Sequence, residues 1–311
     1  MRSFVNPQVA ALPPSGIRKF FDLVAQTRGI ISLGVGEPDF ATPWHIREAA
    51  IYAIEQGRTT YTSNWGLLEL RQAVSRHLER WQELTYDPGS EVLITVGVAE
   101  AIDLVMRAVL EPGDEVLIPE PCFVSYLPCA ELAGGKAVTI PLRAEDQFKL
   151  TPELLRAHIT PRSKVLLIGF PNNPTGAVMS REELAAVARV ASEHDLLVVS
   201  DEIYGEMTYG GEHTSIAALP GMRERTVLLN GFSKAYAMTG WRIGYACGPA
   251  EIIDMMMKIH QYTIMCAPIA GQLAAVEALR NGATERDRMV AEYDRRRKLM
   301  LSGFRQMGLP C

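Results

Sequence analysis

The sequence lacks paired cysteines, long apolar runs and an excess of basic charge. Its five cysteines are scattered with no CxxC spacing: Cys122, Cys129, Cys247, Cys266 and Cys311. This pattern excludes a disulfide framework and predicts reduced thiols in a cytoplasmic protein. No apolar run reaches the ~18 residues that a membrane helix needs. A net charge of −5 gives no electrostatic basis for binding nucleic acid.

Motifs for metal, dinucleotide and secretion signals are also missing. The six histidines are isolated, with no HxH or HxxxH spacing and no cysteine pair nearby, so we expect no metal site. Residues 34–36 (GVG) resemble half of a dinucleotide fingerprint but lack its third glycine and a preceding strand. The first 16 residues carry one basic residue and two adjacent prolines, which is unlike a signal peptide.

What the sequence does contain is an alternation of short apolar runs and helical patterns. With 311 residues, of which 48% are hydrophobic and 22% charged, the composition is that of a globular protein of one large or two modest domains. Seven runs are rich in β-formers and predict strands at residues 91–96, 116–119, 136–140, 164–170, 196–200, 226–230 and 242–246. Strands separated by helices predict βαβ units, a mostly parallel sheet and an α/β fold.

Local signals mark where several helices begin. A helix is predicted directly after Gly97, with apolar residues at helical spacing. Ser180 and Glu183 form a capping-box pattern, and Thr151 followed by Pro152 is typical of another helix start.

Both ends of the chain differ from this middle part. Residues 1–30 predict an arm and a short helix, whereas residues 254–307 are almost entirely helical in pattern. The charged stretch 285–298 is interpreted as a solvated helix face. Because the chain stops just after a helix with no closing strand, we expect a second domain to be incomplete.

Chemically useful side chains follow several of the predicted strands. Residues 97–100 (GVAE) form a helix start that favours an anion, and Asn173 lies in the turn after the strand 164–170. Asp201 and Tyr204 follow the next strand, and Lys234 follows the one after. Because ligands collect at the carboxyl ends of parallel strands, these groups and Arg242 are expected to converge at one edge of the sheet.

The segment 230–244 (NGFSKAYAMTGWRIG) closely resembles the lysine segment of class I pyridoxal-phosphate (PLP) aminotransferases of fold type I. Four other blocks resemble that family's blocks in the same order: 36–40 (GEPDF), 61–66 (YTSNWG), 171–176 (PNNPTG) and 200–204 (SDEIY). The resemblance covers residues 15–311, and the aspartate/aromatic aminotransferase branch is the most similar. It implies a fold type I enzyme with a mostly parallel seven-stranded sheet flanked by helices and a partial small domain.

The resemblance implies specific roles for the catalytic residues. Lys234 would hold PLP as a Schiff base and, once released, move the proton between the substrate Cα and C4′ of the cofactor. Asp201 would pair with the pyridine nitrogen and keep it protonated, so that the ring withdraws electrons. Tyr204 and Asn173 would hydrogen-bond the phenolic oxygen of the ring.

The remaining implied contacts concern the phosphate, the ring face and the substrate. Arg242 suits the phosphate bidentately. The phosphate site would be completed by Ser233 and by backbone N–H groups near Val98, Ala99 and Glu100. Phe123 matches the aromatic residue that stacks on the ring. Tyr61 matches a tyrosine that reaches the phosphate of the neighbouring subunit, which implies a homodimer, and Gly36 matches a glycine beside the substrate carboxylate. Met238 and Trp241 are interpreted as packing residues.

By the same resemblance, residues 1–35 would be an arm and small-domain segment, 36–285 the large PLP-binding domain and 286–311 the start of the small domain. The arginine that binds the substrate α-carboxylate in this family has no counterpart here, and the arginines of the last helix are not assigned that role.

The predicted function is transfer of an amino group from an amino acid to a 2-oxo acid by a ping-pong mechanism. A PLP-dependent C–S β-lyase or decarboxylase, a cofactor-binding fragment without turnover and a nicotinamide-dependent oxidoreductase are the alternatives. Residues 17–21 are candidates for the entrance of the site, and the sequence does not choose the substrate side chain.

Overall fold

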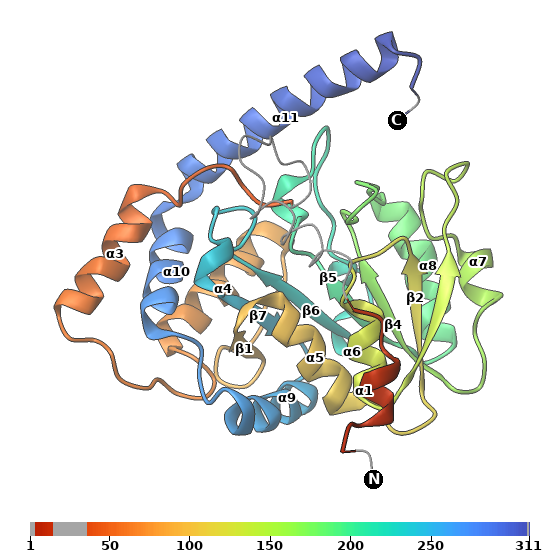
Figure 1. Ribbon diagram of the computed structural model, residues 1–311, viewed down its shortest axis with the longest axis horizontal. Helices are drawn as coiled ribbons and strands as arrows, with labels where there is room; N and C mark the ends of the chain where they lie inside the picture. The colour runs from red at the N-terminus through yellow and green to blue at the C-terminus, as the bar shows by residue number, and fades with distance from the viewer. Residues whose placement is uncertain (1–3, 15–35, 310) are drawn as a thin grey trace.

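The computed structural model describes residues 4–14, 36–309 and 311 (Figure 1). The candidate entrance at residues 17–21 and the first glycine of the 34–36 pattern lie outside the described residues. None of the described helices is both long and apolar enough to cross a membrane.

The centre of the molecule is a seven-stranded sheet of order β1-β7-β6-β5-β4-β2-β3. Strand β7 runs antiparallel to its neighbours β1 and β6, and the other neighbouring pairs are parallel. The strands are β1 (Val92–Thr95), β2 (Glu115–Glu120), β3 (Lys136–Pro141), β4 (Ser163–Gly169), β5 (Leu197–Asp201), β6 (Thr226–Gly231) and β7 (Gly244–Cys247). All seven predicted strands and the mostly parallel α/β fold are thereby confirmed.

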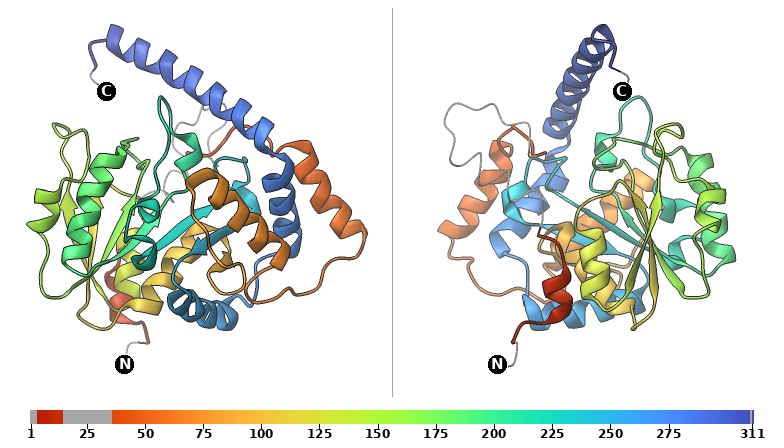
Figure 2. Two further views of the ribbon diagram at one scale, coloured as in Figure 1. Left: turned by 180° about the vertical axis from the view of Figure 1, so that it is seen from behind. Right: turned by 45° about the vertical axis from the view of Figure 1, so that its right-hand side comes forward.

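Helices cover both faces of the sheet (Figures 1 and 2). The described helices are α1 (Pro7–Ala11), α3 (Trp44–Glu55), α4 (Leu68–Gln82), α5 (Gly97–Val109), α6 (Tyr126–Leu132), α7 (Pro152–Arg156), α8 (Arg181–Glu193), α9 (Ala250–Thr263), α10 (Ile269–Asn281) and α11 (Ala283–Gln306). The two predicted caps are present. The Ser180 and Thr151 hydroxyls accept from the N–H groups of Glu183 and Leu154, each at 3.2 Å.

The side-chain alternation of the strands divides the core into layers. Leu93 of β1 and Leu229 of β6 pack with α5, α6 and α9 on one face. Their neighbours Ile94 and Leu228 pack with α3, α4 and α10 on the opposite face. Adjacent strand residues thus serve opposite layers, as the two-residue period of a strand requires.

Helix α11 leaves the body of the protein and extends to the C-terminus (Figure 2). Its charged stretch is mostly solvated, as predicted, but three of its arginines contact the body. Arg286 pairs with Glu206 at 3.4 Å, and Arg296 pairs with Asp39 at 2.8 Å. The Arg297 guanidinium lies 5.1 Å from the ring centre of Tyr209. The predicted domain boundary at 285/286 falls in the first turn of this continuous helix.

Candidate active site

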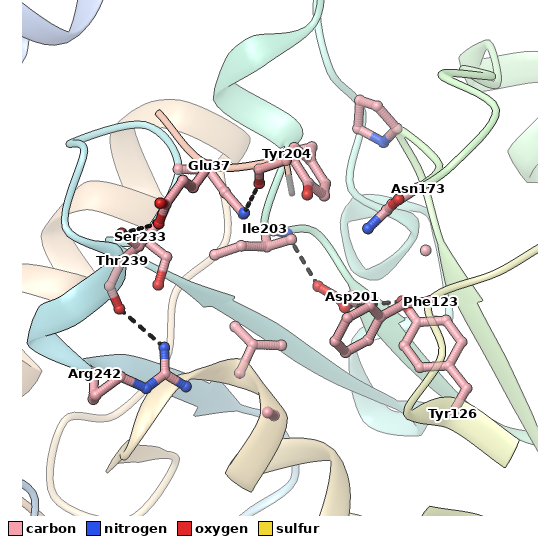
Figure 3. Close-up of a pocket in the computed structure, with 16 residues that line it drawn as sticks. Glu37, Phe123, Tyr126, Asn173, Asp201, Ile203, Tyr204, Ser233, Thr239 and Arg242 are labelled. Atoms are coloured by element: carbon pink, nitrogen blue, oxygen red, sulfur yellow. Dashed lines mark hydrogen bonds between the residues drawn. The ribbon is translucent and has the colours of Figure 1, made fainter. Parts of the chain in front are cut away.

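A cavity of about 580 Å³ opens at the carboxyl ends of the parallel strands (Figure 3). It is lined by Gly36, Glu37, Val98, Ala99, Phe123, Tyr126, Gly169, Pro171, Asn173, Asp201, Ile203, Tyr204, Ser233, Lys234, Thr239 and Arg242. Segments from across the chain therefore meet in one place. Among the residues that the sequence pointed to, Glu100 and Tyr61 do not line this cavity.

Asp201 ends β5 and is buried at the floor of the cavity. Its Oδ2 accepts a hydrogen bond from the Tyr126 hydroxyl at 2.8 Å, and its Oδ1 accepts from the Ile203 N–H at 3.2 Å (Figure 3). Burial raises the pKa of Asp201 to about 6, while these hydrogen bonds and the nearby Lys234 oppose the rise. The carboxylate is therefore poorly solvated, and a cationic group placed beside it would be strongly favoured.

Lys234 follows β6 and reaches into the cavity. Its Nζ donates to the carbonyl oxygen of Gly36 at 2.8 Å and lies 5.6 Å from the ring centre of Tyr204. Burial lowers the pKa of Lys234, and the neighbouring Arg242 lowers it further, against the attraction of Glu37 and Asp201. A lowered pKa increases the fraction of free amine, which is the nucleophilic form.

Arg242 and the start of α5 form a positively polarised corner. Arg242 has a left-handed backbone conformation (φ 57°) and donates through Nη1 to the Thr239 carbonyl oxygen at 3.1 Å. A Cβ added to Gly97, the first residue of α5, would lie 2.6 Å from Nη2 of Arg242. A Cβ on Gly244 would lie 2.8 Å from the backbone nitrogen of Val98. The glycines thus let the guanidinium and β7 approach a helix N-terminus, an arrangement that favours an anion.

Two further walls come from loops. Phe123 contacts the ring of Tyr126 edge-on, with ring centres 5.8 Å apart, and presents its side chain to the cavity. Asn173, in the loop after β4, also lines the cavity (Figure 3). Its neighbour Asn172 is buried and holds this loop by accepting hydrogen bonds from the N–H and hydroxyl of Thr175.

Sequence reasoning missed several of the lining residues. Tyr126 is the most consequential, because it hydrogen-bonds Asp201 across 75 positions of the chain. A buried carboxylate needs donors, but the sequence does not show which residue supplies them. Glu37 and Thr239 were also missed. Met238 is fully buried and Trp241 packs against the core, in agreement with their interpretation as packing residues.

Glu100 and Tyr61 lie elsewhere. The side chain of Glu100 turns back and accepts from the N–H of Val96 and from His260. Tyr61 is 80% exposed on the surface. The exposure of Tyr61 is compatible with a contact to a neighbouring subunit, and the bonds of the Glu100 side chain do not involve its backbone N–H.

The donor set fits PLP. The Asp201 carboxylate suits a protonated ring nitrogen, and the Lys234 amine suits an aldehyde carbon. Arg242 and the N-terminus of α5 together suit a phosphate. The parallel sheet with this constellation at its carboxyl edge defines a PLP-dependent enzyme of fold type I.

Comparison with known proteins narrows this class. The family model described as aminotransferase class I and II matches residues 28–311. The protein YugH of Bacillus subtilis, named as an aminotransferase, is 51% identical over 311 residues, which are 100% of this chain and 81% of that protein. The aspartate aminotransferase of Pyrococcus abyssi is 46% identical over 96% of this chain and 77% of its own length. The chain belongs to the class I and II aminotransferase family.

Solved structures agree with this assignment. The structure of Thermus thermophilus aspartate aminotransferase with maleate superimposes with a TM-score of 0.94 at 41% identity, covering 100% of this chain and 82% of that one. The protein is therefore a PLP-dependent aminotransferase that acts on amino acids and 2-oxo acids.

Proposed function

We propose that Lys234 is the residue that binds PLP covalently in this aminotransferase. The carrying observation is that Lys234 shares one cavity with a buried carboxylate, Asp201, and with the guanidinium of Arg242. When bound, PLP supplies an electron-withdrawing ring that makes the substrate Cα proton acidic. The side chains around it bind the cofactor, orient it and move protons.

Asp201 holds the proton of the ring nitrogen. A nearby cation favours the ionised form of this buried carboxylate. The carboxylate in turn favours the protonated form of the pyridine nitrogen, so the two groups stabilise each other. Tyr204 and Asn173 would donate hydrogen bonds to the phenolic oxygen of bound PLP, and Phe123 would pack against the face of its ring. The position of these side chains on the cavity wall supports these roles.

Arg242 and Ser233 hold the phosphate together with the backbone N–H groups at Val98, Ala99 and Glu100. First-turn N–H groups have no acceptor inside their own helix, and the helix dipole adds to their attraction for an anion. The guanidinium already lies against the start of this helix, which supports a shared phosphate site.

Lys234 Nζ moves the proton during transfer. Once free, the amine lies close to the Gly36 carbonyl and the Tyr204 ring, and its lowered pKa suits a general base. Gly36 would contact the substrate carboxylate, and its position on the cavity wall supports this role. The transfer follows a ping-pong cycle, in which the amino acid leaves as a 2-oxo acid before the second 2-oxo acid binds.

Tyr126→Phe is expected to raise the pKa of Asp201 above its value of about 6, because the tyrosine hydroxyl stabilises the ionised carboxylate. PLP affinity should increase with pH as Asp201 ionises, so the midpoint of that increase should move up by about one pH unit in the variant. The measurement is the PLP dissociation constant between about pH 5 and pH 8. Tyr86→Phe is a matched control, because the Tyr86 hydroxyl is buried without a hydrogen-bond partner among the described residues. An unchanged midpoint in Tyr126→Phe would contradict the role of the hydroxyl.

The active form is a homodimer in which Tyr61 reaches the phosphate site of the neighbouring subunit. Its 80% exposure in a single chain supports this proposal, because a neighbouring subunit that covers this aromatic side chain would remove its apolar surface from water. Mixing Lys234→Ala chains with Tyr61→Phe chains should restore transamination, because one site of each mixed dimer then carries both native residues. Activity that does not exceed the sum of the two separate variants would refute shared sites.

We infer a division of the chain into an arm and small-domain segment at 1–35, a large PLP-binding domain at 36–285 and a small-domain segment at 286–311. A cytoplasmic location is supported by the five free cysteines.

Borohydride reduction of PLP-loaded protein followed by peptide mapping tests the central assignment. A pyridoxyl group on the peptide that contains Lys234 is the expected result. A pyridoxyl group on another lysine, or none in a folded and PLP-saturated sample, would overturn it.

A further inference from the structure

Glu100, in the first turns of α5, and His260 of α9 form a buried hydrogen-bonded pair. The His260 Nδ1 lies 2.9 Å from Oε1 of Glu100. The histidine side chain has no exposed surface and the glutamate side chain is 13% exposed. The two residues are 160 positions apart and join α9 to α5.

The pair fixes the direction of the glutamate side chain. The second oxygen of Glu100 accepts a hydrogen bond from the N–H of Val96, the residue that precedes the helix. Both carboxylate oxygens are therefore engaged, one by His260 and the other by the N–H of Val96. Val98 and Ala99 in the same turn do line the cavity, whereas Glu100 does not.

A free carboxylate in this turn would compete with a bound anion. The N–H groups and the dipole at a helix N-terminus attract any negative charge, whether it belongs to a ligand or to a side chain of the first turn. A phosphate at the start of α5 is therefore bound more tightly when the Glu100 carboxylate is held elsewhere.

His260 is well placed to hold it. The Nε2 of its ring is buried without a hydrogen-bond partner among the described residues, so the only hydrogen bond of the imidazole within them is the one to Glu100. Helix α9, which bears His260, is packed against α5, because Ile253 and Met256 of α9 lie in the same hydrophobic cluster as Ile102 of α5. Burying an imidazole with one nitrogen unpaired is unfavourable, and the bond between Nδ1 and Glu100 offsets part of that cost.

We propose that His260 is a positioning residue that holds the carboxylate of Glu100 at the N–H of Val96, and so away from the N–H groups of Val98 and Ala99 in the anion site. This inference rests on the proposed function, in which that site binds the phosphate of PLP. The pair acts on the phosphate alone, because the ring of the cofactor is held by other residues.

The test compares the affinities of the purified full chain, freed of cofactor, for PLP and for pyridoxal, which lacks the phosphate. His260→Leu removes the donor but keeps an apolar side chain in the core, and is expected to weaken PLP binding about tenfold. Pyridoxal binding should stay within about twofold of the original. His260→Asn, whose amide nitrogen can replace Nδ1 as the donor, should restore the PLP affinity. The double variant Glu100→Gln/His260→Leu should also restore it, because the competing charge is gone.

Two further variants keep the outcomes distinct. Glu100→Gln alone should bind PLP as tightly as the original chain or more tightly; a tenfold loss would overturn the proposal even if His260→Leu does not fold. Arg242→Gln should lose the preference for PLP over pyridoxal. If Arg242→Gln keeps that preference, the proposed phosphate site is wrong. If Arg242→Gln loses it but His260→Leu does not, only the role of His260 is wrong.

Discussion

Lys234→Ala is expected to lower the kcat of transamination by at least about 10⁴-fold, because one amine both binds PLP covalently and moves the Cα proton. Lys234 is the lysine that lines the described cavity, and its lowered pKa favours the free amine. The rate is measured as the conversion of an amino acid to its 2-oxo acid under PLP saturation. The spectrum of the bound cofactor should also change from that of a lysine adduct to that of the free aldehyde.

Lys258→Ala is the matched control. This lysine lies on the surface of α9, with its side chain 55% exposed and paired to Asp254 at 3.6 Å. Its removal should change neither the rate nor the spectrum, because exposed pairs contribute little. A Lys234→Ala variant that retains a tenth of the original rate would contradict the assignment of the lysine.

Asp201→Ala is expected to leave a folded protein with weakened PLP binding and a rate lower by about 10³-fold or more. The rate falls because the ring nitrogen of PLP would no longer be held in its protonated form. Asp201→Asn should behave similarly, since the amide carries no charge although it can still hydrogen-bond with Tyr126. Rates like those of the original chain in either variant would refute the proposed pairing.

Although Asp201→Asn should lower the rate, it should increase the stability of the cofactor-free protein at neutral pH. Burial raises the pKa of Asp201 from 3.8 to about 6, so the folded chain binds this proton more tightly than the unfolded chain. The stability contributed by the protonated carboxyl is fully present below about pH 4 and decreases as the pH rises through 6. Asp201→Asn should remove this decrease, which is on the order of 2–3 kcal/mol. Denaturant unfolding at about pH 4 and pH 7 measures the difference. An equally large decrease in both chains would show that the carboxyl is not the cause.

The two effects have one cause. A carboxylate placed in a poorly solvated cavity destabilises the empty protein and binds a cationic ring nitrogen strongly. Asp201 therefore favours cofactor binding but lowers the stability of the cofactor-free protein, a trade-off that is common at active sites.

Local structure was largely predictable from the sequence. The strands at residues 116–119 and 226–230 are apolar runs that are buried in the sheet, and a continuous apolar run favours that environment. The Ser180 cap depends on residues three positions apart, so its signal is contained within one helical turn. Because the carboxyl ends of parallel strands share one edge, the convergence of Asp201 and Lys234 on one cavity followed from their positions after β5 and β6.

What the sequence left open are contacts between distant segments. Tyr126 follows a strand two places away from β5 in the sheet, and its bond to Asp201 depends on how the loop after β2 is packed. Lys234 and the Gly36 carbonyl are 198 positions apart, and Glu100 and His260 are 160 apart. No periodicity in the chain encodes such pairs.

The strands, several helix starts, the family resemblance and the edge of the sheet that carries the active site could all be predicted from the amino-acid sequence. All of these depend on neighbouring residues or on the parallel order of the strands. The hydrogen bonds from Tyr126 to Asp201 and between Glu100 and His260 became known only from the folded chain. Such choices depend on the packing of side chains between elements, where shifts of a few ångströms decide which donor meets which acceptor.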